Sequence, residues 1–192
     1  ETVLDTIYTL QAMMVDVCVM RDSEPGLPAF VAGHVQPHVS VLNAGEAHVS
    51  HPTQGLLDVL TIRQRKGDLK NLCVAIVGDI SHSRVARSTA TALQALGVGE
   101  LRLVSPASLA PEADEFPGAK RCTSLEDGIR GADVIMALRI QKERMDQSQI
   151  PDVDAFLREW GITERSIQLA QKDCVVLHPG PMNRGFEITS GI

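Results

Sequence analysis

The stretch Cys73-Val74-Ala75-Ile76-Val77, followed by Gly78-Asp79 and then by a helical pattern from Ser83, decides the fold class. Five apolar residues without polar alternation are typical of a strand buried on both faces of a parallel sheet. Similar short runs, rich in β-branched residues, occur at residues 15–20, 39–42, 100–104, 133–136 and 174–177. We therefore predict strands at these six places.

Amphipathic stretches separate the predicted strands. Their apolar residues repeat at the spacing by which a helix packs one face on a core. The repeats are Leu4, Ile7, Leu10, Met13 and Met14; Leu56, Leu57, Leu60 and Thr61; Val85, Leu93 and Leu96; Leu125 and Ile129; and Ile167, Leu169 and Ala170. Alternating strands and helices predict an α/β fold of open parallel sheets with right-handed crossovers and helices on both faces.

A polar, glycine-containing segment at residues 66–71 separates a long helical pattern from the strand at Cys73. Such a composition is typical of a domain boundary. We predict two α/β lobes, at residues 1–66 and 67–192, and a surface loop at residues 106–118, which is rich in proline and glutamate.

Composition limits the classes of function. The chain has 192 residues, of which 44% are apolar, and its formal net charge of −6 argues against a nucleic-acid groove. No apolar run approaches the roughly 20 residues of a membrane-spanning helix. The cysteines lack the spacing of a zinc site, so we interpret them as small buried hydrophobic residues in a reducing, cytoplasmic setting. They are Cys18, Cys73, Cys122 and Cys174.

Polar residues suited to an anion follow five of the predicted strands. Ligands of open α/β sheets bind beyond the carboxyl ends of the strands, so we predict a pocket for a small anionic ligand there. The residues are Arg21; Asn43, His51 and Gln54; Asp79 and Arg84; Arg139, Gln141, Lys142 and Arg144; and His178, Pro179, Gly180, Asn183 and Arg184.

Residue spacing refines this prediction. His51 and Gln54 share a face if they lie on a helix, and Arg139 and Gln141 point the same way in an extended segment. We favour Arg84 over Arg87 because it is nearer the strand end.

The backbone around Gly180, between two prolines, would expose carbonyl oxygens, which can hold an ammonium group.

Each residue also has an ordinary structural interpretation. His51 before Pro52 fits a helix start, where a histidine more often caps or packs than catalyses. Gly78-Asp79 fits a simple turn, and the chain lacks the GxGxxG dinucleotide fingerprint. Basic residues after residue 138 fit a solvated helix face, and no specific role is predicted for His34, His38, His48 or His82.

Several motifs, in order along nearly the whole chain, resemble the carbamoyltransferase family, and within it the catalytic chains of aspartate carbamoyltransferases. Arg-x-Gln-x-Glu-Arg together with His-Pro-Gly-Pro favours aspartate as the acceptor over ornithine. The motifs are Val19-Met20-Arg21, Asn43-Ala44-Gly45, His51-Pro52-Thr53-Gln54, Val77-Gly78-Asp79, Ser83-Arg84-Val85, residues 138–144, and His178-Pro179-Gly180-Pro181 with Met182-Asn183-Arg184-Gly185.

The resemblance implies transfer of a carbamoyl group from carbamoyl phosphate to the amine of L-aspartate, an early step of pyrimidine synthesis. Catalysis would come from placement and from stabilisation of developing negative charge. It implies that His51 and Arg21 polarise the carbonyl, with Arg21 also touching phosphate, and that Gln54 holds the carbamoyl amide.

The aspartate carboxylates would contact Arg84, Arg139 and Gln141, because guanidinium forks match carboxylates. The incoming amine would contact backbone carbonyls of Pro179 and Gly180. No metal, nucleotide or flavin site is visible in the sequence, so no cofactor is expected. The resemblance also implies a homotrimer with shared active sites, in some members joined to regulatory or dihydroorotase-like chains.

Parts of the family pattern are not found in these 192 residues. They are the Ser-Thr-Arg-Thr-Arg phosphate segment, the Ser/Lys loop that reaches a neighbouring subunit, and the C-terminal helices; Glu46-Ala47 also replaces the usual Asp-Gly. We therefore expect a segment of a longer catalytic chain, inactive by itself, with both lobes incomplete. The alternatives are a carbamoyltransferase with another amino-acid acceptor, or a non-catalytic regulatory or scaffolding relative.

Overall fold

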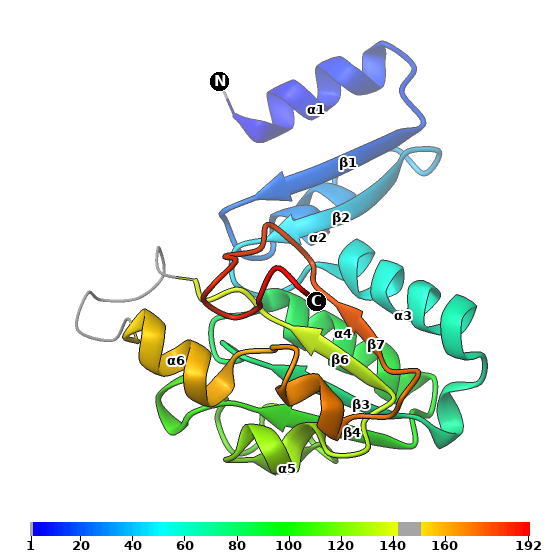
Figure 1. The fold of residues 1–192 in the computed structure, drawn as a ribbon. Helices are drawn as coiled ribbons and strands as arrows, with labels where there is room; N and C mark the ends of the chain where they lie inside the picture. The colour runs from blue at the N-terminus through cyan, green and yellow to red at the C-terminus, as the bar shows by residue number, and fades with distance from the viewer. Residues whose placement is uncertain (1, 142–150) are drawn as a thin grey trace.

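Two parallel sheets with flanking helices form the chain, as a computed structural model shows for residues 2–141 and 151–192 (Figure 1). The larger sheet contains β3 (Cys73–Val77), β4 (Glu100–Val104), β5 (Lys120–Cys122), β6 (Val134–Ala137) and β7 (Val175–Leu177). Their order is β5-β4-β3-β6-β7, and every neighbouring pair is parallel. The α/β class predicted from the sequence is confirmed.

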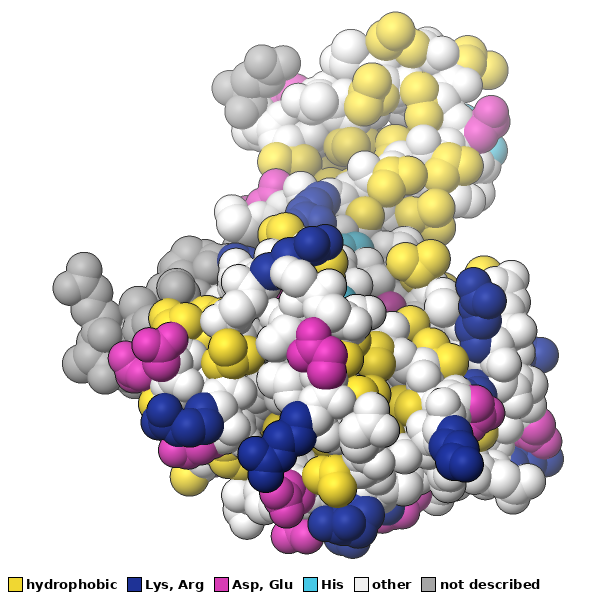
Figure 2. Space-filling view, in the orientation of Figure 1, with side chains coloured by type: hydrophobic (Ala, Val, Ile, Leu, Met, Phe, Trp, Pro, Cys, Tyr) yellow, Lys and Arg dark blue, Asp and Glu magenta, His cyan; other side chains and the backbone are white. Residues whose placement is uncertain are grey.

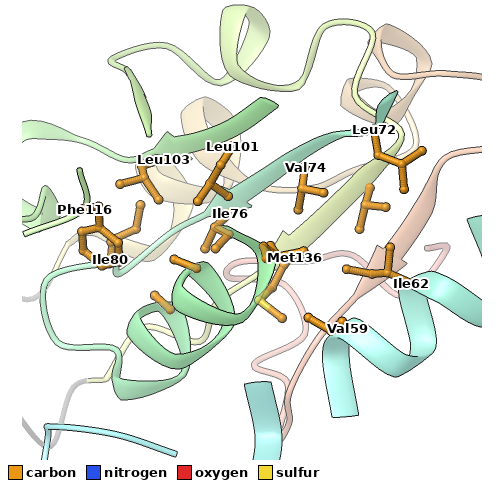
Figure 3. Packing of buried hydrophobic residues seen from close by; sticks show 14 of the residues in the cluster. Val59, Ile62, Leu72, Val74, Ile76, Ile80, Leu101, Leu103, Phe116 and Met136 are labelled. Carbon is orange, nitrogen blue, oxygen red and sulfur yellow. The ribbon is translucent and has the colours of Figure 1, made fainter. Parts of the chain in front are cut away.

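Helices cover both faces of the larger sheet. α3 (Pro52–Lys66) and α4 (Arg84–Ala95) lie on one face, where Val59 and Ile62 pack with Met136 of β6 in the main apolar cluster (Figure 3). α5 (Leu125–Ile129) and the 3-10 helix η5 (Ser166–Leu169) pack on the other face. All of β3 is therefore buried, as its sequence predicts.

The smaller sheet pairs β1 (Val17–Asp22) with β2 (Ser40–Glu46). α1 (Val3–Ala12) and α2 (Leu27–Ala32) cover the face that carries Cys18. The opposite face exposes Val17, Val19 and Leu42, and Figure 2 shows hydrophobic side chains gathered over this part of the molecule. The expectation that residues 15–20 are buried on both faces is therefore wrong for β1.

The buried face of α3 differs from the predicted one. Leu56, Leu57 and Leu60 are exposed, whereas the residues that face α4 and the sheet are Gly55, Asp58, Val59 and Ile62. A Cβ at Gly55 would lie 2.8 Å from the backbone of Ser88, so this glycine permits the close contact between α3 and α4. The face of α3 that packs inward is therefore the one that allows close backbone approach to α4, and not the one with the most leucines.

Other elements were not predicted or differ in kind. α2, β5 and α6 (Val153–Trp160) are additional, and the late helical pattern is the single 3-10 turn η5. The segment 106–118 is only partly a surface loop, because it contains η2 (Ala107–Leu109) and buries Leu109 and Phe116. A further 3-10 turn, η1 (Leu69–Asn71), lies in the predicted boundary segment.

The cysteines are free thiols, and burial raises the pKa of Cys73 and of Cys174 to about 11. Across residues 2–141 and 151–192, no helix has both the length and the apolar character needed to cross a membrane.

Candidate active site

One pocket of about 230 Å³ brings the predicted site residues together. It lies where the carboxyl ends of the two sheets meet, and it receives side chains from β1 and from the segments after β2, β3, β6 and β7. Its wall consists of Arg21, His51, Gln54, Ser83, Arg84, Val85, Leu138, Arg139, Gln141, Pro179, Gly180 and Pro181. All the residues to which the family resemblance gives a catalytic or binding role therefore line the same pocket. Other strand-end residues predicted for the anion pocket do not line it; they are Asn43, Asp79, His178, Asn183 and Arg184.

The N-terminus of α3 carries His51 and Gln54. Pro52 occupies the first helical position, where its missing N–H is not needed, and the His51 side chain makes no capping hydrogen bond. Instead, the backbone N–H of His51 donates to Ser88 Oγ on α4 at 2.8 Å. His51 is thus the N-cap residue of α3, as its position before Pro52 predicts, but its side chain does not cap the helix and lines the pocket instead.

The His51 imidazole lies close to two guanidinium groups. Partial burial, followed by the positive charges of Arg84 and Arg21, lowers the pKa of His51 below its ordinary value of 6.5. Thr53 Oγ1 lies 3.2 Å from His51 Nδ1. The ring is therefore neutral at neutral pH, and it can offer one N–H to an oxygen in the pocket.

A buried carboxylate orients Gln54. Asp58 accepts a hydrogen bond from Gln54 Nε2 at 2.9 Å and another from the Thr89 hydroxyl at 2.7 Å. Burial raises the pKa of Asp58, and these two hydrogen bonds oppose the rise. Asp58 therefore binds the amide nitrogen of Gln54 while tying α3 to α4.

Arg84 begins α4, where the Ser83 hydroxyl caps the helix by accepting from the Ala86 N–H at 3.1 Å. The Arg84 guanidinium is largely buried and donates to the Ala47 carbonyl at 2.9 Å. A Cβ at Gly45, where φ is +123°, would lie 3.0 Å from the guanidinium carbon. Glycine is therefore required beside Arg84.

Arg87, the alternative considered above, is used differently. It donates to the carbonyls of Ser81 and His48 and pairs with Glu115. It does not line the 230 Å³ pocket.

Asp79 holds the segment of Arg139 and Gln141 against the end of β3. It is fully buried, and it accepts from the Gln141 N–H at 3.2 Å and bonds His82 Nδ1 at 2.8 Å. Gly78 precedes it with φ +120°, and a Cβ there would lie 2.8 Å from the Leu138 carbonyl oxygen. Gly78 and Asp79 therefore do more than form a turn, because they hold the segment after β3 against the segment after β6.

A second hollow of about 800 Å³ adjoins the pocket. It shares Arg21 and Arg84 with the pocket, and it adds Asp22, Ser23, Ala47, His48, Ser81 and His82. In the described ranges there is no cluster of His, Cys, Asp and Glu suited to a metal ion. Lys142 and Arg144, also named from the sequence, lie outside the described residues.

Fold and pocket together define a two-sheet α/β protein with a cationic pocket at the strand ends. The family model described as aspartate/ornithine carbamoyltransferase, Asp/Orn binding domain, matches residues 70–192. The companion carbamoyl-P binding domain matches residues 1–64. The chain therefore belongs to the aspartate/ornithine carbamoyltransferase family.

Solved structures agree with this assignment. Aspartate transcarbamoylase from Trypanosoma cruzi is similar both in complex with N-(phosphonacetyl)-L-aspartic acid, at 27% identity and a TM-score of 0.81, and in complex with carbamoyl phosphate, at 28% and 0.81. In both, 99% of this chain is covered, against 61% and 62% of the other chain.

Ornithine carbamoyltransferase from Pyrococcus furiosus, at 24% identity and a TM-score of 0.81, shares the fold over 100% of this chain and 62% of its own. The chain thus spans about three fifths of the length of these structures.

Proposed function

We propose that the chain is part of an enzyme that transfers a carbamoyl group from carbamoyl phosphate to the amine of L-aspartate. The amine nitrogen bonds to the carbonyl carbon, the bond from that carbon to the phosphate oxygen breaks, and the nitrogen loses a proton that the departing phosphate accepts. The products are N-carbamoyl-L-aspartate and phosphate. The pocket that combines Arg84, Arg139 and Gln141 with His51, Gln54 and Arg21 carries this proposal.

Aspartate is favoured as the acceptor by the charge of the pocket wall. Two carboxylates match the planar donors of Arg84, Arg139 and Gln141, with which they form short, charge-assisted hydrogen bonds. An acceptor with a cationic side chain, such as ornithine, would place an ammonium group beside guanidinium groups. Repulsion of this kind discriminates between substrates as effectively as attraction does.

The carbamoyl end of the substrate is assigned to His51, Arg21 and Gln54. We assign the Thr53 hydroxyl as the donor to His51 Nδ1, 3.2 Å away, so that the neutral ring carries its proton on Nε2 and donates from there to the carbonyl oxygen. Arg21 adds positive charge where that oxygen becomes negative in the transition state. Gln54, held by Asp58 at its amide nitrogen, accepts from the carbamoyl NH₂.

The attacking amine is assigned to the carbonyl oxygens of Pro179 and Gly180. These residues, in the segment after β7, line the same pocket as Arg139 and Gln141. Accepting oxygens there hold the amine with its lone pair toward the carbonyl carbon, and such placement lowers the barrier without covalent chemistry. By resemblance, the proposal extends to a homotrimer with shared active sites that acts in pyrimidine synthesis.

The test measures carbamoylated product from the full-length protein with aspartate and with ornithine as acceptors. Arg139→Lys keeps the charge but loses the fork, so kcat/KM for aspartate should fall roughly 10- to 100-fold, the equivalent of about 1.5–3 kcal/mol. Arg165→Lys, at an exposed position outside the pocket, is the matched control and should change nothing.

Two outcomes contradict the proposal. Preference for ornithine would assign the pocket to another acceptor. Binding of N-(phosphonacetyl)-L-aspartate by calorimetry without turnover, or the absence of both, would identify a non-catalytic relative.

A further inference from the structure

The segment after β7 contains a buried imidazole and a buried carboxylate to which the proposed reaction assigns no role. The side chains of His178 and Glu187 are only 5% and 2% exposed, and His178 Nε2 lies 3.1 Å from Glu187 Oε1. Neither residue lines the 230 Å³ pocket. His178 and Pro181 flank the proposed amine site at Pro179 and Gly180, but only Pro181 lines the pocket.

A hydrogen bond connects this pair to the pocket wall. The Gly180 N–H donates to His178 Nδ1 at 2.9 Å. Because Nδ1 accepts, the neutral ring carries its proton on Nε2, from which it donates to Glu187. The Asn183 N–H donates to the same Glu187 oxygen at 2.6 Å. Two backbone amides of the segment are thus fixed by one imidazole–carboxylate pair.

The carboxylate is held firmly. Its neighbours Phe186 and Ile188 are buried, and Phe186 meets Phe156 edge-on at 5.4 Å between ring centres. The Ile162 N–H also donates to the Glu187 carbonyl at 2.9 Å. Glu187 therefore forms a rigid anchor for His178.

This anchor has a cost in folding free energy. Glu187 Oε2 is buried and has no hydrogen-bond partner within residues 2–141 and 151–192. A buried polar group left unpaired destabilises the folded state, and more so when it is charged. Apolar side chains of similar volume would often make a more stable core. Stability alone therefore does not account for the pair, whereas a fixed backbone at Gly180 does.

The geometry of the peptide unit transmits this constraint to the pocket. The Pro179–Gly180 bond is trans, since Gly180–Pro181 is the cis bond of the described residues. In a planar trans unit the C=O points opposite to the N–H. With the Gly180 N–H aimed at His178, the Pro179 carbonyl must point away from the imidazole.

We infer that His178 and Glu187 are positioning residues for the acceptor amine. They orient the Gly180 amide and, through the rigid peptide plane, the Pro179 carbonyl that accepts from the amine. The inference rests on the proposed function, because it deepens the assignment of that carbonyl.

A matched pair of variants separates the two bonds of the imidazole. In His178→Asn, the side-chain oxygen replaces Nδ1 and still accepts from Gly180. In His178→Gln, the longer side chain reaches Glu187 but no longer offers an acceptor at the Nδ1 position. In the full-length protein, His178→Gln should raise KM for aspartate about tenfold, because a displaced positioning group weakens alignment.

The remaining readouts exclude a merely structural role. KM for carbamoyl phosphate and the melting temperature should hardly change in His178→Gln, and His178→Asn should stay within about threefold of wild type for aspartate. Glu187→Ala should also raise KM for aspartate. Glu187→Gln, which keeps an accepting oxygen, should bring that KM most of the way back to the wild-type value. Hydrogen exchange of the Gly180 amide should be faster in His178→Gln than in His178→Asn.

Each other result overturns the inference. Equal aspartate KM values in the two His178 variants, or parallel rises in both KM values with a lower melting temperature, would identify a structural pair. Wild-type protein without turnover on aspartate would overturn the proposed function and this inference together. Normal wild-type turnover with an unchanged aspartate KM in His178→Gln would overturn the inference alone.

Discussion

The two sheets of this chain are built from the same strand–helix units but differ in how much of their apolar surface is covered. The five-stranded sheet buries both faces, beneath α3 and α4 on one side and α5 on the other. The β1–β2 sheet covers one face and leaves Val17, Val19 and Leu42 exposed. Folding free energy is therefore concentrated in the larger sheet, while the pocket draws residues from both.

The largest expected effect tests this difference in the centre of β3. Ile76→Ala removes a fully buried side chain and should lower the free energy of unfolding by about 4 kcal/mol. Val31→Ala, equally buried but in α2, should cost about 2 kcal/mol. Denaturant titration gives both values.

Hydrogen exchange distinguishes where each variant opens. Val31→Ala should accelerate exchange in β1 and β2 and leave β3 protected, because local units open independently of the global transition. Equal acceleration in both sheets would show a single cooperative unit and contradict the comparison.

The larger sheet was also the more predictable of the two. β3 and β6 follow directly from uniform apolar runs, because a strand buried on both faces has no polar positions. β4 is less uniform, since Glu100 and Arg102 alternate with its buried residues. α3 shows the limit, since its leucines point outward and its inward face includes Gly55 and Asp58. Only the neighbouring helix determines that face, and its sequence pattern does not reveal it.

The candidate site likewise has a part that could be predicted from the sequence and a part that could not. Side chains at strand ends could be found from the sequence, because parallel topology gathers those ends at one edge. The groups that hold them could not, because their partners are distant in sequence. Ser88 lies 37 residues from His51, Thr89 lies 31 from Asp58, and Asp79 lies 62 from Gln141.

The second prediction tests whether α3 packs closely against α4, which covers the larger sheet. In Gly55→Ala the new methyl meets Ser88 backbone atoms at 2.8 Å, so α3 and α4 must separate. Despite a gain of up to about 1 kcal/mol in helix propensity, the variant should lose about 1–2 kcal/mol overall. Turnover should fall as well, because His51 and Gln54 move with α3.

Gly33→Ala is the matched control at the end of α2. Its Cβ would lie 3.5 Å from the nearest atom, at an ordinary contact distance and a helical φ of −75°. It should change stability by less than about 1 kcal/mol, and in the stabilising direction. A Gly55→Ala variant as stable as Gly33→Ala would contradict the close helix contact.

The third prediction uses the pKa of His51 to test whether β1 of the smaller sheet lies close to this residue. Arg21 comes from β1 and Arg84 from α4, and both lower the pKa of His51 after burial does. Arg21→Gln should therefore move the pKa of His51 upward toward 6.5, as NMR titration of the ring would show. An unchanged pKa would mean that β1 does not approach His51.

The sign of the pH dependence follows from the lowered pKa. Below pH 6.5 the unfolded state binds a proton that the folded state resists, so His51 makes unfolding easier as pH falls through that range. Activity that requires the neutral ring should decline on the acid side at a pH below 6.5. Replacing His51 by Ala should abolish that limb of the profile, together with most of the turnover.

The smallest effect is expected on the outer face of α3. Leu57 is 53% exposed, so Leu57→Gln should change the free energy of unfolding by no more than about 0.5 kcal/mol. Ile62→Gln, five residues further along the same helix, places a polar group in the main apolar cluster and should cost several times more. If Leu57→Gln instead cost more than about 1 kcal/mol, the outer face would be covered in solution, and the contrast between the two sheets would be smaller than their exposed residues indicate.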